Sequence, residues 1–209
     1  MGDAGVVASG HAVGVRAKGQ TRPARTFWWD RKPPAEPDVL RAVIFDADSA
    51  LADIERDSPR IGLIDSVMSL FCAGIWVGVV SARRREWAET LVRDVIGDGL
   101  VETIVTVDDL AEIKAGHAGD AELYRLALWE MGIMPRNALA VTGSGRGLRA
   151  AVAAELAAVM VTAGEGVGQR FVGAAELRAA YDGPHPLLAA EYQRAHRRRS
   201  IVQRRPRAA

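Results

Sequence analysis

Two aspartates separated by one residue, Asp46 and Asp48, are the side chains of this 209-residue chain best placed to do chemistry. They follow Ala42 to Phe45, an unbroken apolar run that predicts a strand buried on both faces. Carboxylates at such a place are costly to bury without a cation or hydrogen-bond donors. With a divalent cation bound, Asp46 could attack phosphorus as the nucleophile while Asp48 transfers the leaving-group proton as the acid/base. The simpler alternative is a polar turn that ends a strand.

Two further residues can bind phosphate, each after a later predicted strand. Ser81 carries a hydroxyl that can donate to a phosphate oxygen, and Lys114 carries an ammonium group that can neutralise developing charge. Ligands of parallel α/β sheets bind outside the carboxyl ends of the strands, so we expect both residues near Asp46. Each also has a structural interpretation, Ser81 as a helix N-cap and Lys114 as a solvated lysine at a helix start.

The elements that must position these residues alternate along the chain from Val39 onward. Short apolar runs predict strands, and stretches with apolar residues at spacings of three and four predict helices. This alternation is typical of βα units, and it predicts a three-layer, doubly wound α/β domain with a five-stranded parallel sheet. The expected strands are 42–45, 76–80, 104–107, 138–141 and 159–162, and the expected helices are 63–71, 86–96, 121–131 and 148–156.

Composition divides the chain into three parts. Residues 1–37 are basic and rich in Gly, Ala, Pro and Arg, which predicts a mostly disordered arm, although its Trp28-Trp29 pair favours docking on the domain. Residues 38–182 form the predicted core domain. Residues 183–209 carry seven arginines against one acidic residue, and we expect an Arg-rich tail that is solvated or paired with an anion.

This ordered set of residues resembles the haloacid-dehalogenase-like superfamily, with its first motif at Asp46-Ala47-Asp48, its second at Ser81 and its third at Lys114. Residues 41–48 and 147–154 resemble most closely the branch of beta-phosphoglucomutase-like and sugar-phosphate phosphatases, and residues 51–57 and 123–128 add weaker matches. The resemblance implies hydrolysis of a phosphate monoester through an aspartyl-phosphate on Asp46. It also implies a Mg²⁺ ion held by Asp46 and the backbone carbonyl of Asp48.

The chain departs from that family after the fourth predicted strand. Thr142-Gly143-Ser144 stands where the family usually has two acidic residues before the serine. Magnesium sites rest on one or two protein carboxylates, so Mg²⁺ binding is expected to be weak or lost because Thr142 and Gly143 replace the expected carboxylates. Glu165, just past the fifth predicted strand, is an alternative source of a carboxylate.

Loop sequence and spacing depart from the family as well. Ser49-Ala50 replaces the usual Gly-Thr, which predicts a reshaped loop because a flexible turn residue is lost. Asp48 to Ser81 and Ser81 to Lys114 are each 33 residues apart, which leaves room for one helix and one strand. We therefore expect no cap domain, the lid that closes over small substrates in this branch.

Three functions stay open on these grounds. The favoured one is a catalytically impaired domain that binds a phosphorylated small molecule or a phosphoprotein. The second is an active Mg²⁺-dependent capless phosphohydrolase. The third is an adaptor whose basic tails bind nucleic acid or an anionic surface, or fold onto the acidic core or a second subunit of a homo-oligomer. The glycine-rich turn at 142–147 reads Gly-x-Gly-x-Gly, so its spacing argues against dinucleotide binding.

Composition also bears on the compartment. No apolar run approaches the roughly 18 residues of a membrane span, and the N-terminus has no signal-like apolar region. The single cysteine, Cys72, allows no internal disulfide and lies in an apolar run, where we expect it to be buried. These features predict a cytoplasmic protein without a transmembrane segment.

Overall fold

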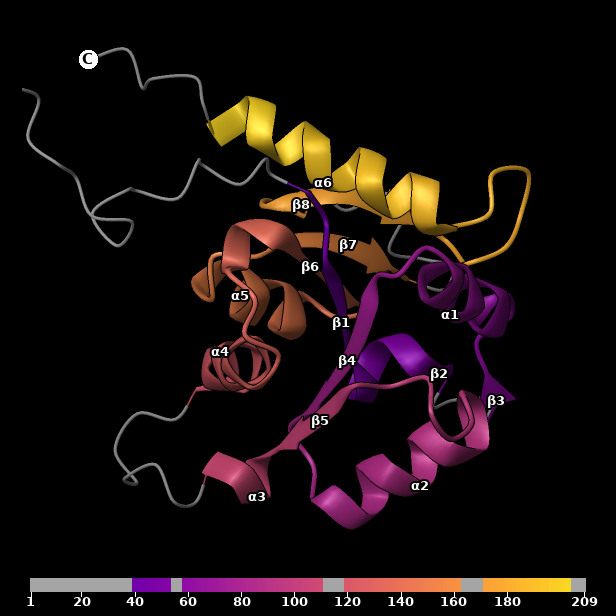
Figure 1. The fold of residues 1–209 in the computed structure, drawn as a ribbon, viewed down its shortest axis with the longest axis vertical. Coiled ribbons are helices and arrows are strands. Elements are labelled where there is room, and N and C mark those ends of the chain that lie inside the picture. The colour runs from indigo at the N-terminus through magenta and orange to yellow at the C-terminus, as the bar shows by residue number, and fades with distance from the viewer. Residues whose placement is uncertain (1–38, 54–57, 111–118, 163–170, 204–209) are drawn as a thin grey trace, which may run out of the picture. The chain divides into compact units, whose positions relative to one another are not determined.

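The computed structural model describes residues 39–53, 58–110, 119–162 and 171–203. Six parallel strands form its main sheet in the order β5-β4-β1-β6-β7-β8, so the chain crosses over at β1, where the two halves of the sheet meet (Figure 1). Among the described residues, a helix lies in each of the crossovers from β1 to β4, β4 to β5, β5 to β6 and β6 to β7, as parallel pairing requires. The strands are β1 (Ala42–Asp46), β4 (Trp76–Ser81), β5 (Thr103–Thr106), β6 (Ala138–Thr142), β7 (Ala157–Val161) and β8 (Ala174–Arg178).

Helices cover both faces of this sheet, which confirms the predicted three-layer α/β fold. Along β1, Val43 and Phe45 pack with α1, α2 and α6, whereas Ile44 packs with α4 and α5 on the opposite face. Burial on both faces explains why the strands read as unbroken apolar runs. The helices are α1 (Leu63–Cys72), α2 (Arg85–Val95), α3 (Val107–Leu110), α4 (Asp120–Glu130), α5 (Gly145–Ala153) and α6 (Ala189–Gln203).

The predicted count of five strands was one too low, because β8 does not look like the others in sequence. Its five residues, Ala174–Arg178, are all only partly buried, and the strand pairs with β7 alone at the edge of the sheet. Its pairing also shifts register between Ala158 and Val159. An edge strand that carries Glu176 and Arg178 lacks the continuous apolar run by which the other five were identified.

The prediction of a solvated tail from residue 183 was also wrong for the part that the structure describes. Helix α6 packs on the sheet, and Leu187, Tyr192 and Ala195 are fully buried in the core. The Tyr192 hydroxyl lies 2.7 Å from the Ser66 hydroxyl, which donates to the Leu187 carbonyl at 2.7 Å. Few apolar residues of this helix are buried, and because arginines surround them the sequence shows no clear helical spacing of apolar residues. The N-terminal arm at 1–37 lies outside the described residues.

Helix α1 corrects one further expectation. It buries Leu63, Val67 and Leu70, which recur at spacings of four and three along one face. Cys72 lies off that face and is exposed, so it does not fill the core as predicted. Within the described ranges, no helix is long and apolar enough to cross a membrane.

The stretches between the candidate site residues are short. From Asp48 to Ser81 the chain forms the hairpin of β2 (Ala52–Asp53) and β3 (Ser58–Pro59), then α1 and β4. After Ser81 come α2, β5 and α3, which ends at Leu110. These elements connect the sheet to its covering helices, and they place the carboxyl ends of β1, β4, β5 and β6 at one edge.

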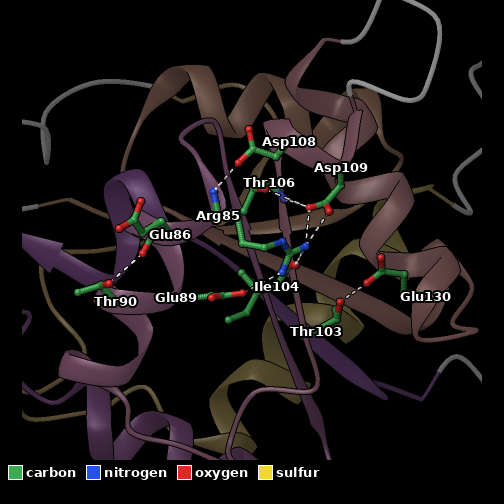
Figure 2. A network of polar contacts seen from close by, with 10 residues as sticks. All are labelled: Arg85, Glu86, Glu89, Thr90, Thr103, Ile104, Thr106, Asp108, Asp109 and Glu130. Atoms are coloured by element: carbon green, nitrogen blue, oxygen red, sulfur yellow. Dashed lines mark hydrogen bonds and ion pairs between the residues drawn. The ribbon is translucent and has the colours of Figure 1, made fainter.

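An ion-pair network fixes this edge at β5. The Arg85 guanidinium donates to both carboxylate oxygens of Asp109 at 2.7 and 2.8 Å and to the Ile104 carbonyl at 3.1 Å (Figure 2). Asp109 also accepts from the backbone N–H and the hydroxyl of Thr106, at 2.7 and 3.0 Å. The backbone N–H of Arg85 donates to Asp108 at 2.9 Å. The start of α2 is thereby tied to the turn that follows β5.

Candidate active site

Asp46 is the last residue of β1, and it is the N-cap residue of the tight π-helical turn that follows, η2 (Ala47–Leu51). Its Oδ1 accepts the backbone N–H of Asp48 at 3.1 Å. The turn is anchored from outside, because the Tyr181 hydroxyl donates to the Ala50 carbonyl at 2.9 Å and Arg60 donates to the Ser49 carbonyl at 2.9 Å. The turn that carries both aspartates is therefore held by residues from distant elements.

Two hydroxyl groups converge on the other oxygen of Asp46. Ser49 Oγ donates to Oδ2 at 2.7 Å and Thr142 Oγ1 donates to the same atom at 2.8 Å. Each hydroxyl oxygen in turn accepts a backbone N–H, Ser49 from Gly143 at 2.8 Å and Thr142 from Ser144 at 3.2 Å. The ends of β1 and β6 are therefore joined by a closed hydrogen-bond network around one carboxylate.

Asp46 is only 8% exposed, and burial raises the pKa of its carboxyl group above the ordinary value of 3.8. The hydrogen bonds from Ser49 and Thr142 favour the ionised form and offset part of this increase, while the neighbouring Asp48 adds to it. The balance leaves Asp46 a weaker acid than a free aspartate.

Asp48 and Ser81 lie together, although they are 33 residues apart, so Ser81 is at the same end of the sheet as Asp46. Ser81 Oγ donates to Asp48 Oδ1 at 3.1 Å, the Ala82 N–H donates to Oδ2 at 2.7 Å, and Arg83 lies 3.5 Å from Oδ1. The proposed N-cap role of Ser81 is not found, since Arg84 is the N-cap residue of α2. Ser81 ends β4, and its hydroxyl accepts the Arg83 N–H at 3.0 Å.

The glycines of the turn after β6 are required by packing around Asp46. A Cβ at Gly147 would lie 2.3 Å from Asp46 Oδ2 and 2.2 Å from Thr142 Oγ1. A Cβ at Gly143 would lie 2.1 Å from the Ser49 carbonyl oxygen. Ser144 caps α5 by accepting the Gly147 N–H at 3.0 Å. Close approach to the Asp46 carboxylate at Gly147, and to the Ser49 backbone carbonyl at Gly143, therefore accounts for glycine at the two positions.

A cavity of about 280 Å³ opens at this edge of the sheet. Several of its residues were not predicted from the sequence, although Arg83 lies two residues after the end of β4 and Arg146 lies in the first turn of α5. Arg146 pairs with Asp120, and Arg83 lies over the Trp87 ring with 4.3 Å to the ring centroid. The polar residues that line the cavity are Asp46, Asp48, Ser81, Arg83, Asp120, Tyr124, Ser144 and Arg146.

Other predicted site residues cannot be placed. Lys114, the candidate phosphate-binding lysine, lies in the 111–118 segment outside the described residues, and so does Glu165 in the 163–170 segment. Trp28 and Trp29 lie outside them as well. Among the residues that the structure does describe, no three His, Cys, Asp or Glu side chains come together as a metal-binding group.

Comparisons with known proteins give a structural match but no sequence match. No model of a known protein family matches the chain, and no curated protein does. CbbY from Rhodobacter sphaeroides, solved in complex with phosphate, is 18% identical with a TM-score of 0.61 over 74% of this chain and 99% of that one. Beta-phosphoglucomutase from Clostridium difficile is 13% identical with a TM-score of 0.60 over 78% of this chain and all of that one.

A haloacid dehalogenase-like hydrolase from Bacteroides fragilis is also similar, at 15% identity and a TM-score of 0.57 over 68% of this chain and 97% of that chain. Identities this low show a shared fold, and they leave activity to be argued from the site itself. The strand order, the position of Asp46 and Asp48 after β1 and these likenesses agree. The chain has the haloacid-dehalogenase-like fold, as its Asp46-Ala47-Asp48 turn predicts.

Proposed function

We propose that this chain is a haloacid-dehalogenase-like domain that binds a phosphorylated ligand and has little or no phosphatase activity. The observation that carries the proposal is the pairing of Asp46: two hydroxyl protons, from Ser49 and Thr142, are directed at its Oδ2. Both lone pairs of Oδ2 are occupied, so this oxygen is not available to a cation, and Oδ1, which accepts the Asp48 N–H, would have to attack phosphorus without metal assistance. The ligand class is a phosphorylated small molecule or a phosphoprotein.

The donors around Asp46 do not fit a magnesium ion. Mg²⁺ takes oxygen ligands in near-ideal octahedral geometry and is usually held by one or two carboxylates with several waters. The end of β6 offers Thr142, whose hydroxyl already donates to Asp46, and Gly143, which has no side chain. The nearby N–H groups of Gly143 and Ser144 are donors, which a cation avoids. Metal-assisted attack by Asp46 is therefore not part of the proposal.

The same cavity is suited to an oxyanion. The nine-residue helix α5 begins at its wall, and helix N-termini attract negative charge through their free N–H groups. The guanidinium groups of Arg83 and Arg146 lie at the cavity and are 49% and 68% exposed, so both can reorient toward a ligand. CbbY, whose fold is similar, was solved in complex with phosphate. Phosphate recognition without turnover is consistent with all of these features.

We propose that the pocket that binds the phosphate group is open to solvent. Only a two-stranded hairpin and α1 are described between Asp48 and β4, and we propose that no cap domain closes over the cavity. Caps exclude water from small substrates. An open pocket accepts a phosphate carried on a larger molecule, which favours a phosphorylated macromolecule over a small sugar phosphate.

The binding part of the proposal is tested by titrating the protein with inorganic phosphate and with a phosphoserine peptide, followed by NMR. We expect Arg83→Gln and Arg146→Gln to weaken binding at least threefold, about 0.7 kcal/mol each. Arg93→Gln is the matched control, because Arg93 is an exposed arginine on α2 that does not line the cavity. Equal affinity in all variants would count against phosphate binding at this site.

The main competing function is an active Mg²⁺-dependent phosphohydrolase, favoured by the contact between Asp48 and Ser81 beside Asp46. Hydrolysis of p-nitrophenyl phosphate separates the two functions. We expect no Mg²⁺-dependent hydrolysis above that of the Asp46→Asn variant. Magnesium-dependent turnover that this substitution abolishes would establish the enzyme and refute the proposed loss of activity.

A further inference from the structure

The Ser49 hydroxyl has the position and partners of a group that replaces a cation beside Asp46. It lies 2.7 Å from Asp46 Oδ2, 3.2 Å from Thr142 Oγ1 and 2.8 Å from the Gly143 backbone nitrogen. We propose that Ser49 and Thr142 together take the place of a divalent ion at Asp46 Oδ2, so that Asp46 holds no metal ion and any ligand binds independently of one. This inference deepens the proposed function and rests on it only for the identity of the ligand.

The number of protons fixes the direction of the hydrogen bonds. Ser49 and Thr142 each have one hydroxyl proton. Backbone N–H groups already donate to both hydroxyl oxygens, from Gly143 to Ser49 and from Ser144 to Thr142. Both hydroxyl protons are therefore free to point at Asp46 Oδ2, at 2.7 and 2.8 Å. A cation that binds Oδ2 would have to displace at least one of these donors.

Space around Oδ2 is also closed. A Cβ at Gly147 would lie 2.3 Å from this oxygen, so the backbone at the start of α5 packs directly against it. A magnesium ion needs room for its own waters as well as for its protein ligands. No such room exists on the side of Asp46 that faces Gly147, and the side that faces Ser49 and Thr142 is filled by their hydroxyl groups.

The turn that carries Ser49 is held in this arrangement from several directions. Arg60 donates to the Ser49 carbonyl at 2.9 Å, and the same carbonyl oxygen would lie 2.1 Å from a Cβ at Gly143. An acidic side chain at position 143 therefore does not fit while Ser49 stays where it is. The clash involves the backbone carbonyl of residue 49, which any residue there would keep, so a carboxylate is better introduced at position 142, whose side chain already reaches Asp46.

The test measures binding of Mn²⁺ by electron paramagnetic resonance, with Ser49→Gly/Thr142→Asp as the variant. This change removes one donor and adds a carboxylate where the Thr142 hydroxyl now contacts Asp46. We expect the wild type to show no Mn²⁺ binding that depends on Asp46. The double variant should bind at least tenfold more tightly, about 1.4 kcal/mol at 25 °C, and Asp46→Asn in its background should abolish the gain.

A matched control and a folding check accompany the variant. Ser144→Ala removes another hydroxyl that lines the cavity but donates nothing to Asp46, so it should leave Mn²⁺ affinity unchanged. The buried carboxylate pair of the double variant is expected to destabilise the metal-free protein. Thermal unfolding with and without Mn²⁺ then reports binding as a raised Tm. Ser49→Gly alone, a milder change, should raise Mn²⁺ affinity by a smaller factor.

The outcomes separate this inference from the proposed function. Binding of Mn²⁺ to the wild type that Asp46→Asn removes would overturn it. So would both Ser49 variants showing no gain in Mn²⁺ affinity or Tm. Inorganic phosphate is titrated in parallel with Mg²⁺ and with EDTA, and equal affinity in both supports metal-independent binding. If the wild type excludes Mn²⁺ yet binds no phosphate, the exclusion stands and only the proposed ligand is refuted.

Discussion

Asp46 after β1 and Asp109 after β5 lie at the same edge of the sheet, and each accepts a hydrogen bond from a threonine hydroxyl, but only Asp109 has a cation as its main partner. Arg85 donates to both oxygens of Asp109, whereas Asp46 accepts from two hydroxyls and one backbone N–H. Burial acts to raise the pKa of both groups. At Asp109 the hydrogen bonds from Arg85 and Thr106 outweigh burial, and its pKa is lowered below 3.8.

The two carboxylates therefore contribute differently to the stability of the fold. A carboxylate with a lowered pKa stabilises the folded protein as an anion, and one with a raised pKa weakens it when ionised. The network around Asp109 in Figure 2 therefore stabilises the folded protein. The ionised form of Asp46 lowers the stability of the folded protein, and such buried carboxylates with raised pKa values are common at functional sites.

The largest expected effect comes from filling the space beside Asp46. Gly147→Ala would place a Cβ 2.3 Å from Asp46 Oδ2, so the carboxylate or the start of α5 must move. We expect a loss of about 3 kcal/mol in the free energy of unfolding, measured by urea denaturation. Gly145→Ala is the control, because its nearest contact would be the flexible end of Arg149 at 3.6 Å. Equal effects of the two substitutions would show that Asp46 is not tightly enclosed.

The second largest loss of stability is expected from disrupting the hydrogen bonds around Asp109, after β5. Asp109→Asn removes the charged acceptor of Arg85 and Thr106 and is expected to cost about 2 kcal/mol at neutral pH. The folded-state pKa of Asp109 is lowered, so the stability it contributes is present above pH 3.8 and is lost as the pH falls through the folded value. The difference from wild type in urea denaturation should therefore shrink in acid. A difference that stays constant with pH would contradict the ion pair.

The coupling between Arg85 and Asp109 should be smaller and is isolated by a double-mutant cycle. Combining Arg85→Gln with Asp109→Asn should reveal a coupling free energy of about 1 kcal/mol. The control cycle uses Arg93 and Asp98, an ion pair 3.8 Å apart with side chains that are 61% and 87% exposed. Solvent screens such pairs, and we expect its coupling to be indistinguishable from zero. Comparable values in the two cycles would remove the distinction between the pairs.

The smallest effect, and the sharpest test of the comparison, is the pH dependence of Asp46→Asn. Burial raises the folded-state pKa of Asp46, so its favourable contribution is complete below pH 3.8 and is lost as the pH rises through the folded value. Asparagine cannot ionise, so the stability of the variant relative to wild type should improve between acid and neutral pH. This trend is opposite to that of Asp109→Asn. Parallel pH trends in the two variants would show that the two sites do not differ as described.

The fold class, and the closeness of Asp46, Asp48 and Ser81, could be inferred from the amino-acid sequence alone. Unbroken apolar runs are a local signal of strands buried on both faces, so the strands around Asp46 and Ser81 could be predicted. The meeting of Ser81 with Asp48 followed from parallel topology, which brings strand ends to one edge. Strand β8 and helix α6 could not be found in this way, because β8 has only partly buried residues and the few buried residues of α6 are spaced among charged ones.

The hydrogen-bond partners of Asp46 became visible only in the folded chain. Thr142 was noted in the sequence as a missing carboxylate, yet its hydroxyl donates to Asp46, which is 96 residues away. Ser49 was expected to reshape a loop, and the structure shows its hydroxyl shared between Asp46 and the backbone of Gly143. Hydrogen bonds and close packing are sensitive to differences of a few tenths of an ångström in the distances between segments far apart in the chain. Residue types and spacing alone do not encode such distances, which is why the sequence identified the carboxylate and the fold determined its partners.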